Sequence, residues 1–67
     1  MEKVFDKSGH FVCMGDASTG LIEYRYKDSE IKVIIPVGQQ AVIRRGNRTT
    51  VVSRTPDGFL AESSLAA

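Results

Sequence analysis

The positions of the turn-forming residues constrain the fold of this chain more than any other feature. Clusters of Gly, Pro, Asp, Asn and Ser recur along the 67-residue sequence, at 6–9, 15–20, 28–29, 38, 46–47 and 56–58. The segments between them are too short for ordinary helices, and they are rich in Val, Ile, Tyr, Phe and Thr. This spacing is typical of an all-β meander. We therefore expect an antiparallel meander of five to six strands, forming a curled sheet or a small barrel of SH3-like size.

The length of the chain allows one domain with a small core. A chain this short buries only about 60% of the surface that its unfolded form exposes. Such a core leaves no room for a deep, water-excluding catalytic cavity, and it favours stability gained from a partner or a second copy. We expect the β domain to span residues 1–62. Residues 63–67 are expected to fray, or to form a helical turn begun by Ser63.

Charge and cysteine content bear on partners and location. The formal net charge is +1, so no global field draws the chain to nucleic acid or membrane. The single cysteine, Cys13, excludes an internal disulfide framework and suits a reducing compartment. No signal-like apolar segment opens the sequence, and no apolar run approaches the roughly 18 residues that a spanning helix needs. We expect a soluble cytoplasmic protein without membrane association.

The stretch 21–36 predicts the clearest hairpin. If Asp28 and Ser29 form a two-residue turn, Tyr24 lies opposite Val33, and one face of the hairpin becomes wholly apolar. A slip of one residue would mix the two faces, so the pattern fixes which side chains share a face. Tyr24 and Tyr26 lie on this apolar face, which favours their burial over a role in stacking bases.

A second hairpin is predicted around the dipeptide Gly46-Asn47. A two-residue turn there places Arg45 opposite Arg48 and Ile43 opposite Thr50. A three-residue turn would place Arg45 opposite Thr49 instead. Two outer segments complete the expected sheet: a weaker hairpin with its loop at residues 6–9, and a last short strand at 59–62. The polar loop GDASTG (15–20) lacks the lysine of a phosphate-binding loop, so we interpret it as a connecting turn.

Arginines gather around the second hairpin. Arg44, Arg45 and Arg48 lie within five positions, and Arg54 follows at the far end of the strand. Guanidinium groups placed together can grip phosphates or carboxylates, and a basic two-stranded ribbon can enter a nucleic-acid groove. The alternative is that these arginines only keep a hairpin tip soluble. We take Arg44, Arg45, Arg48 and Arg54 as the candidate anion or nucleic-acid site.

No constellation of residues predicts catalysis or a metal. His10 and Cys13 form an H-x-x-C pair, but the chain has no second histidine or cysteine to complete a metal site. Residues three apart in a strand face opposite sides, which also argues against a nucleophilic pair. We expect Cys13 to be a small core residue and His10 a partly exposed strand end. Four carboxylates, Glu23, Glu30, Asp57 and Glu62, are scattered, with no shared environment for acid–base work.

The sequence therefore predicts a small binding or adaptor module rather than an enzyme, with no cofactor and no metal. Its short length favours protein–protein contact or self-association through a sheet face or edge. The alternative is a nucleic-acid-binding β domain that uses the basic hairpin tip. Its hallmark would be binding that weakens steeply with salt.

Overall fold

The computed structural model describes residues 1–65, and this part of the chain consists of strands and turns without a helix. The predicted all-β class is confirmed, with seven strands rather than five or six. The strands are β1 (Glu2–Phe5), β2 (Phe11–Asp16), β3 (Leu21–Tyr26), β4 (Ser29–Ile34), β5 (Gln40–Arg45), β6 (Arg48–Thr55) and β7 (Gly58–Leu65).

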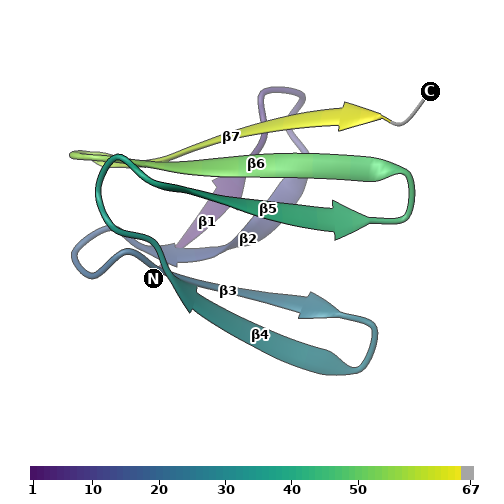
Figure 1. Cartoon of the computed structure of the whole chain (residues 1–67), viewed down its shortest axis with the longest axis horizontal. Coiled ribbons are helices and arrows are strands. Elements are labelled where there is room, and N and C mark those ends of the chain that lie inside the picture. The colour runs from purple at the N-terminus through teal and green to yellow at the C-terminus, as the bar shows by residue number, and fades with distance from the viewer. Residues whose placement is uncertain (66–67) are drawn as a thin grey trace.

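The strands form two antiparallel sheets that are not closed into a barrel. One sheet has the order β1-β2-β3-β4 and the other β5-β6-β7 (Figure 1). The meander is broken at residues 35–39, where the chain crosses from the first sheet to the second. At the start of this connection the Ile35 N–H still donates to the Gly20 carbonyl, in register with the β3–β4 ladder, and at its end Gly38 and Gln39 bond to the backbone of Arg54. On the opposite side of the molecule, Asp6 and Ala61 form a single parallel bridge between the sheets.

The core lies between the two sheets and is small. Both sheets contribute to it, and around it pack Tyr24, Ala41 and Phe59. A bulge in the β1–β2 ladder, where the register shifts between Val4 and Phe5, leaves Val12 as an extra residue. The bulge allows two consecutive residues of β2 to be buried. The buried apolar residues are Val4, Val12, Cys13, Ile22, Ile35, Ile43, Val52 and Ala61.

The β3–β4 hairpin differs from the predicted register by two residues. Lys27 and Asp28 form the turn, Tyr26 pairs with Ser29, and Tyr24 pairs with Ile31. The predicted pairing of Tyr24 with Val33 is therefore wrong, although the apolar residues still share one face. A shift of two positions leaves the alternation of side chains unchanged, so the pattern could not distinguish the two registers.

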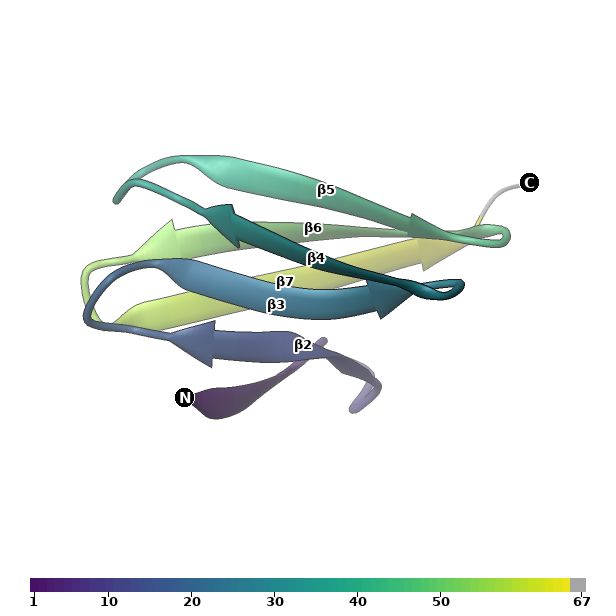
Figure 2. The same cartoon turned by 90° about the horizontal axis from the view of Figure 1, so that it is seen from below.

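Burial of this apolar face decreases toward the hairpin turn. Ile22 is buried and Tyr24 is partly buried, but Tyr26 is 40% exposed, contrary to the prediction that both tyrosines are buried. The cause is the divergence of the sheets. The β3–β4 and β5–β6 turns lie at the same end of the molecule in both views (Figures 1 and 2), and Figure 1 shows that they are apart. The molecule is therefore closed at the 35–39 connection and open at the hairpin tips.

The β5–β6 hairpin has the predicted register. Arg45 pairs with Arg48, Ile43 with Thr50 and Ala41 with Val52, so the two-residue turn is confirmed. Gly46 has a φ of 61°, the conformation expected at the first central position of a hairpin turn of type II′. The β6–β7 ladder extends to the pair Arg48–Leu65.

The end of the chain departs from the expected tail. Ser63 to Leu65, expected to fray or to form a helical turn, continue β7, while residues 66–67 lie outside the described part. The described residues include no helix long and apolar enough to cross a membrane.

Replacing Lys27 with glycine is expected to stabilise the protein. Lys27 has a φ of 57°, a conformation that a side chain disfavours and glycine tolerates. We expect Lys27→Gly to raise the free energy of unfolding by about 1 kcal/mol, measured by urea denaturation. Lys27→Ala is the control, since it also removes the contact of Lys27 with the Tyr26 ring but keeps the unfavourable φ. Equal stability of the two variants would contradict the prediction.

Candidate functional site

The two sides of the β5–β6 hairpin separate the predicted arginines. Side chains of paired residues lie on the same side of a ladder, and side chains alternate along each strand. Arg45 and Arg48 therefore share the inner face with buried Ile43 and Thr50, whereas Arg44 projects from the outer face and is exposed. The structure brings Arg45 and Arg48 together at the open end of the molecule, and it places Arg44 and Arg54 elsewhere.

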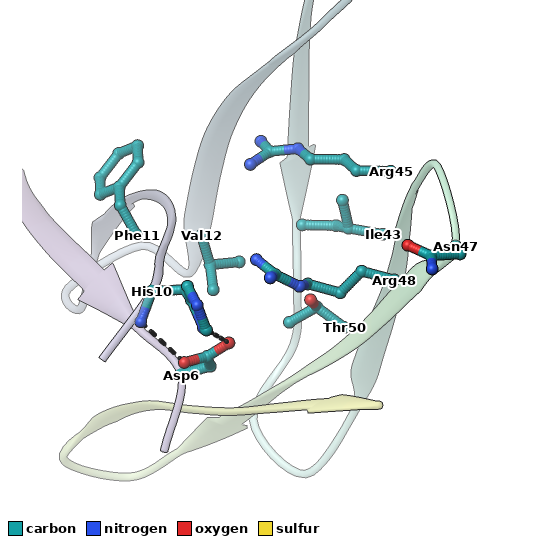
Figure 3. Close-up of a pocket in the computed structure, with 9 residues that line it drawn as sticks. All are labelled: Asp6, His10, Phe11, Val12, Ile43, Arg45, Asn47, Arg48 and Thr50. Atoms are coloured by element: carbon teal, nitrogen blue, oxygen red, sulfur yellow. Dashed lines mark hydrogen bonds and ion pairs between the residues drawn. The ribbon is translucent and has the colours of Figure 1, made fainter. Parts of the chain in front are cut away.

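Arg45 and Arg48 border a cavity of about 180 Å³ between the sheets. Figure 3 shows the guanidinium group of Arg48 extending from the hairpin toward His10 and Asp6, and that of Arg45 extending toward Phe11. The floor is apolar, formed by Val12 and Ile43. The remaining lining residues are Phe11, Asn47 and Thr50.

Arg45 is held in a largely apolar setting. Its guanidinium carbon lies 5.7 Å from the centre of the Tyr24 ring, within the range of a cation–π contact. Its Nε is buried, and no acceptor for it lies among the described residues. A buried N–H donor without an acceptor is unfavourable, so the side chain retains unused hydrogen-bonding capacity.

Asp6 organises the other side of the cavity. One carboxylate oxygen accepts the backbone N–H groups of Ser8 and His10, both at 2.9 Å, and the other accepts the Ser63 hydroxyl at 2.6 Å. Ser63 is in turn hydrogen-bonded to Thr50, at 2.7 Å. The hydrogen bond from Ser63, followed by that from the His10 backbone, lowers the pKa of Asp6 to about 2. This network links the 6–10 loop of the first sheet to β6 and β7 of the second.

The sequence interpretation missed the role of Asp6. Its only signal was its place at the start of the turn 6–9, where an aspartate accepts hydrogen bonds from the N–H groups that follow. Its partner Ser63 lies 57 residues away, in the segment expected to fray. Lys7 and Glu62 add an exposed ion pair of 2.6 Å across the same junction, worth little by itself.

Arg54 joins the sheets at the closed end. Its Nη1 donates to the carbonyls of Ile35 at 3.0 Å and Thr19 at 3.3 Å, and its Nη2 donates to the carbonyl of Ala17 at 3.3 Å. Gly20 lies beneath this group with a φ of 83°, and a Cβ there would collide with the guanidinium and with the Ile35 carbonyl. Arg54 thus contacts protein carbonyls rather than the hairpin tip.

The remaining candidates occupy ordinary structural positions. Cys13 is buried, as predicted, and its burial raises the pKa of the thiol to about 11, which keeps it protonated at neutral pH. His10 has a half-exposed side chain, with Nδ1 3.4 Å from an Asp6 oxygen. The GDASTG loop connects β2 to β3 and bonds internally, since Asp16 accepts from the backbone and hydroxyl of Ser18. No group of three potential metal ligands occurs within residues 1–65.

Comparison with known proteins gives no relative: no protein family, no curated protein and no solved structure matches this chain.

Stability is expected to fall in acid through Asp6. An aspartate whose pKa is lowered in the folded state stabilises that state above its ordinary pKa, and the contribution is lost as pH falls through the folded value. For Asp6 this window runs from about pH 4 down to about pH 2. We expect Ser63→Ala, which removes the main cause, to flatten the fall of the thermal unfolding midpoint across this window.

The control for that measurement is a variant that acts on Asp16 instead of Asp6. Its pKa is also lowered, chiefly by the Ser18 hydroxyl, so it contributes to the same acid response. Ser18→Ala should reduce only the Asp16 contribution, and the double variant should reduce both. An unchanged pH profile in Ser63→Ala would contradict the assignment.

Truncating Arg54 is expected to loosen the closed end. Arg54→Ala removes three hydrogen bonds and leaves the carbonyls of Ala17, Thr19 and Ile35 without this donor. We expect a loss of about 2 kcal/mol in the free energy of unfolding. Arg44→Ala, on the exposed outer face, is the matched control and should change stability by less than about 0.5 kcal/mol. Similar losses in the two variants would refute the role of Arg54.

Proposed function

We propose that this protein is a small binding module that associates with a second copy of itself through the free edge of β4. The observation that carries the proposal is the position of β4 at the end of its sheet, together with the charge pattern along it. An edge strand presents unpaired N–H and C=O groups that another strand can take up.

The outward-facing backbone groups of β4 follow from the hairpin register. In an antiparallel ladder, alternate pairs direct their N–H and C=O groups at each other or away from each other. Counting from the two-residue turn, Glu30, Lys32 and Ile34 direct these groups toward the free edge. An added antiparallel strand would therefore pair with these three positions.

One register of self-pairing places opposite charges together. A two-fold axis at Ile31 sets Glu30 of each copy opposite Lys32 of the other, and the two Ile31 residues face each other. An axis at Glu30 or at Lys32 would oppose like charges, which is unfavourable on a sheet. An axis at Val33 would pair only the last half of β4. The charges thus discourage other pairings while they favour this one.

Other edges are less suited to this role. The only charged residues of β5 are Arg44 and Arg45, so no register of self-pairing along β5 sets opposite charges together. The edge strand β1 is short and carries a bulge. The edge strand β7 of the second sheet is bridged through Ala61 to Asp6. Beside β4, the exposed residues Ile34 and Val37 add apolar surface, Ile34 being 65% exposed.

Sedimentation equilibrium over a range of concentrations tests the proposal. We expect the wild type to shift from its 7.3 kDa monomer to a dimer as concentration rises. Glu30→Lys places lysine opposite lysine twice, and it should raise the dissociation constant about tenfold or more. Asp57→Lys, which makes the same charge change at an exposed turn, is the control and should associate as the wild type does.

Mixing two variants separates interface charge from changes within one chain. Glu30→Lys and Lys32→Glu should each associate poorly alone, since each would oppose like charges. Mixed together they should form a heterodimer, because the lysines of one strand then face the glutamates of the other. A wild type that stays monomeric up to about 1 mM, or a mixture that behaves as its components do, would overturn the proposal.

A further inference from the structure

The paired arginines at the open end carry charge that no described residue neutralises. Arg45 and Arg48 lie directly opposite each other in the last pair of the β5–β6 ladder, on the inner face. Neither takes part in an ion pair within residues 1–65. Like charges directly opposed on a sheet are unfavourable, and partial burial strengthens their repulsion. An anion held between them would relieve it.

Asp6 is the acidic residue that lines this cavity, and its oxygens are already engaged. They accept hydrogen bonds from the backbone of Ser8 and His10 and from the hydroxyl of Ser63. No ion pair joins Asp6 to Arg45 or Arg48. The carboxylate therefore shapes the wall of the cavity and leaves the guanidinium donors free.

The dimensions and donors of the cavity suit a phosphate group. Its volume is about 180 Å³. A water molecule takes about 30 Å³ in the liquid, so the cavity has room for a group larger than a single water molecule. Two planar guanidinium groups match the oxygens of a phosphate, to which each can donate two hydrogen bonds. Asn47 and Thr50, which also line the cavity, can add neutral hydrogen bonds.

A second cavity continues from the first and has a different character. It has a volume of about 480 Å³ and shares Arg45 and Phe11 with the phosphate-sized cavity. Met14 and Tyr24 line it as well, and these apolar and aromatic surfaces suit a planar ring. It opens where the ladder of β2 and β3 ends at the Met14–Glu23 pair, so the two strands separate beside Tyr24.

The charges of the second cavity select the kind of ligand. Glu23 and Glu30 line it together with Arg25. Glu23 forms an ion pair of 3.3 Å with Lys32, which leaves Glu30 to accept hydrogen bonds from ring N–H and amino groups and to repel a second phosphate. A strand of nucleic acid, which carries a phosphate at every nucleotide, fits this arrangement less well than a single phosphorylated base.

We propose that Arg45 and Arg48 bind the phosphate of a nucleoside monophosphate between the two sheets, with its base against Phe11 and Tyr24. Arg45 lies between the two cavities and contacts both parts of the ligand, and its buried Nε gains an acceptor. Glu30 belongs both to the second cavity and to the proposed association of β4, but Arg45 and Arg48 lie outside β4, so their variants test this site independently of the association.

A nuclear magnetic resonance titration tests the site, with signals from backbone amides and arginine Nε–H groups. Inorganic phosphate should shift the Nε–H signals of Arg45 and Arg48. Adenosine monophosphate should bind at least about tenfold more tightly than phosphate and also shift the ring signals of Phe11 and Tyr24. Adenosine alone should bind weakly. No shift with either phosphate compound up to about 20 mM would overturn the proposal.

Three variants distinguish a built site from diffuse positive charge. Arg48→Gln and Arg45→Gln should each weaken binding of adenosine monophosphate at least about tenfold, since each removes a charged donor. Arg44→Gln makes the same charge change on the outer face of the same hairpin, and it should leave binding unchanged. The amide spectrum of each variant reports whether the fold is retained. Equal weakening in all three would overturn the proposal.

A single-stranded oligonucleotide provides the last comparison. If it binds more tightly than adenosine monophosphate, and with a salt dependence of several phosphates, the ligand is a nucleic acid and the proposal is wrong. If it binds no more tightly than the mononucleotide, the carboxylate of Glu30 disfavours the additional phosphates as inferred.

Discussion

The guanidinium group of Arg54 joins the two sheets where the chain crosses from one to the other, and the rest of the architecture depends on this junction. Three backbone carbonyls from the 17–19 loop and the 35–39 connection converge on it, and its own backbone bonds to Gly38 and Gln39. Eight buried apolar side chains form a core too small to cover both sheets along their length. The polar junction therefore sets the spacing of the sheets at one end and lets them diverge at the other.

The open end of the molecule follows from this arrangement, and the proposed ligand-binding arginines lie there. The Asp6–Ser63–Thr50 network fixes the 6–10 loop against the second sheet, while Arg45 and Arg48 extend into the space that remains. At the closed end the two Nη groups of Arg54 donate to protein carbonyls, although its Nε, like that of Arg45, is buried without an acceptor among the described residues. At the open end two arginines share a cavity with a carboxylate whose oxygens are already engaged. The hydrogen bonds of the Nη groups distinguish the structural Arg54 from the proposed ligand-binding arginines.

The sequence predicted one of the two hairpin registers correctly and the surroundings of the side chains poorly. The Gly46-Asn47 dipeptide fixed the register of its hairpin, because its turn requires a residue that tolerates positive φ. The β3–β4 turn carries no such residue, so the chosen register was wrong by two positions. Arginines close in sequence were treated as one cluster, but strand alternation directs Arg44 outward and Arg45 inward. Arg54 was included with them, although its partners lie between 19 and 37 residues away.

By itself, the sequence determined the all-β class, the hairpins and which apolar residues share a face, since these depend on turn chemistry and on the two-residue period of a strand. The tertiary structure alone decided that the strands divide into two open sheets and that Asp6 meets Ser63. It also decided that Arg54, and not the arginines of the hairpin tip, donates its Nη groups to backbone carbonyls. The physical reason is that these features depend on contacts between residues far apart in the chain. Such contacts form where backbone carbonyls and side chains from different strands and loops come together, and a local sequence pattern does not predict them.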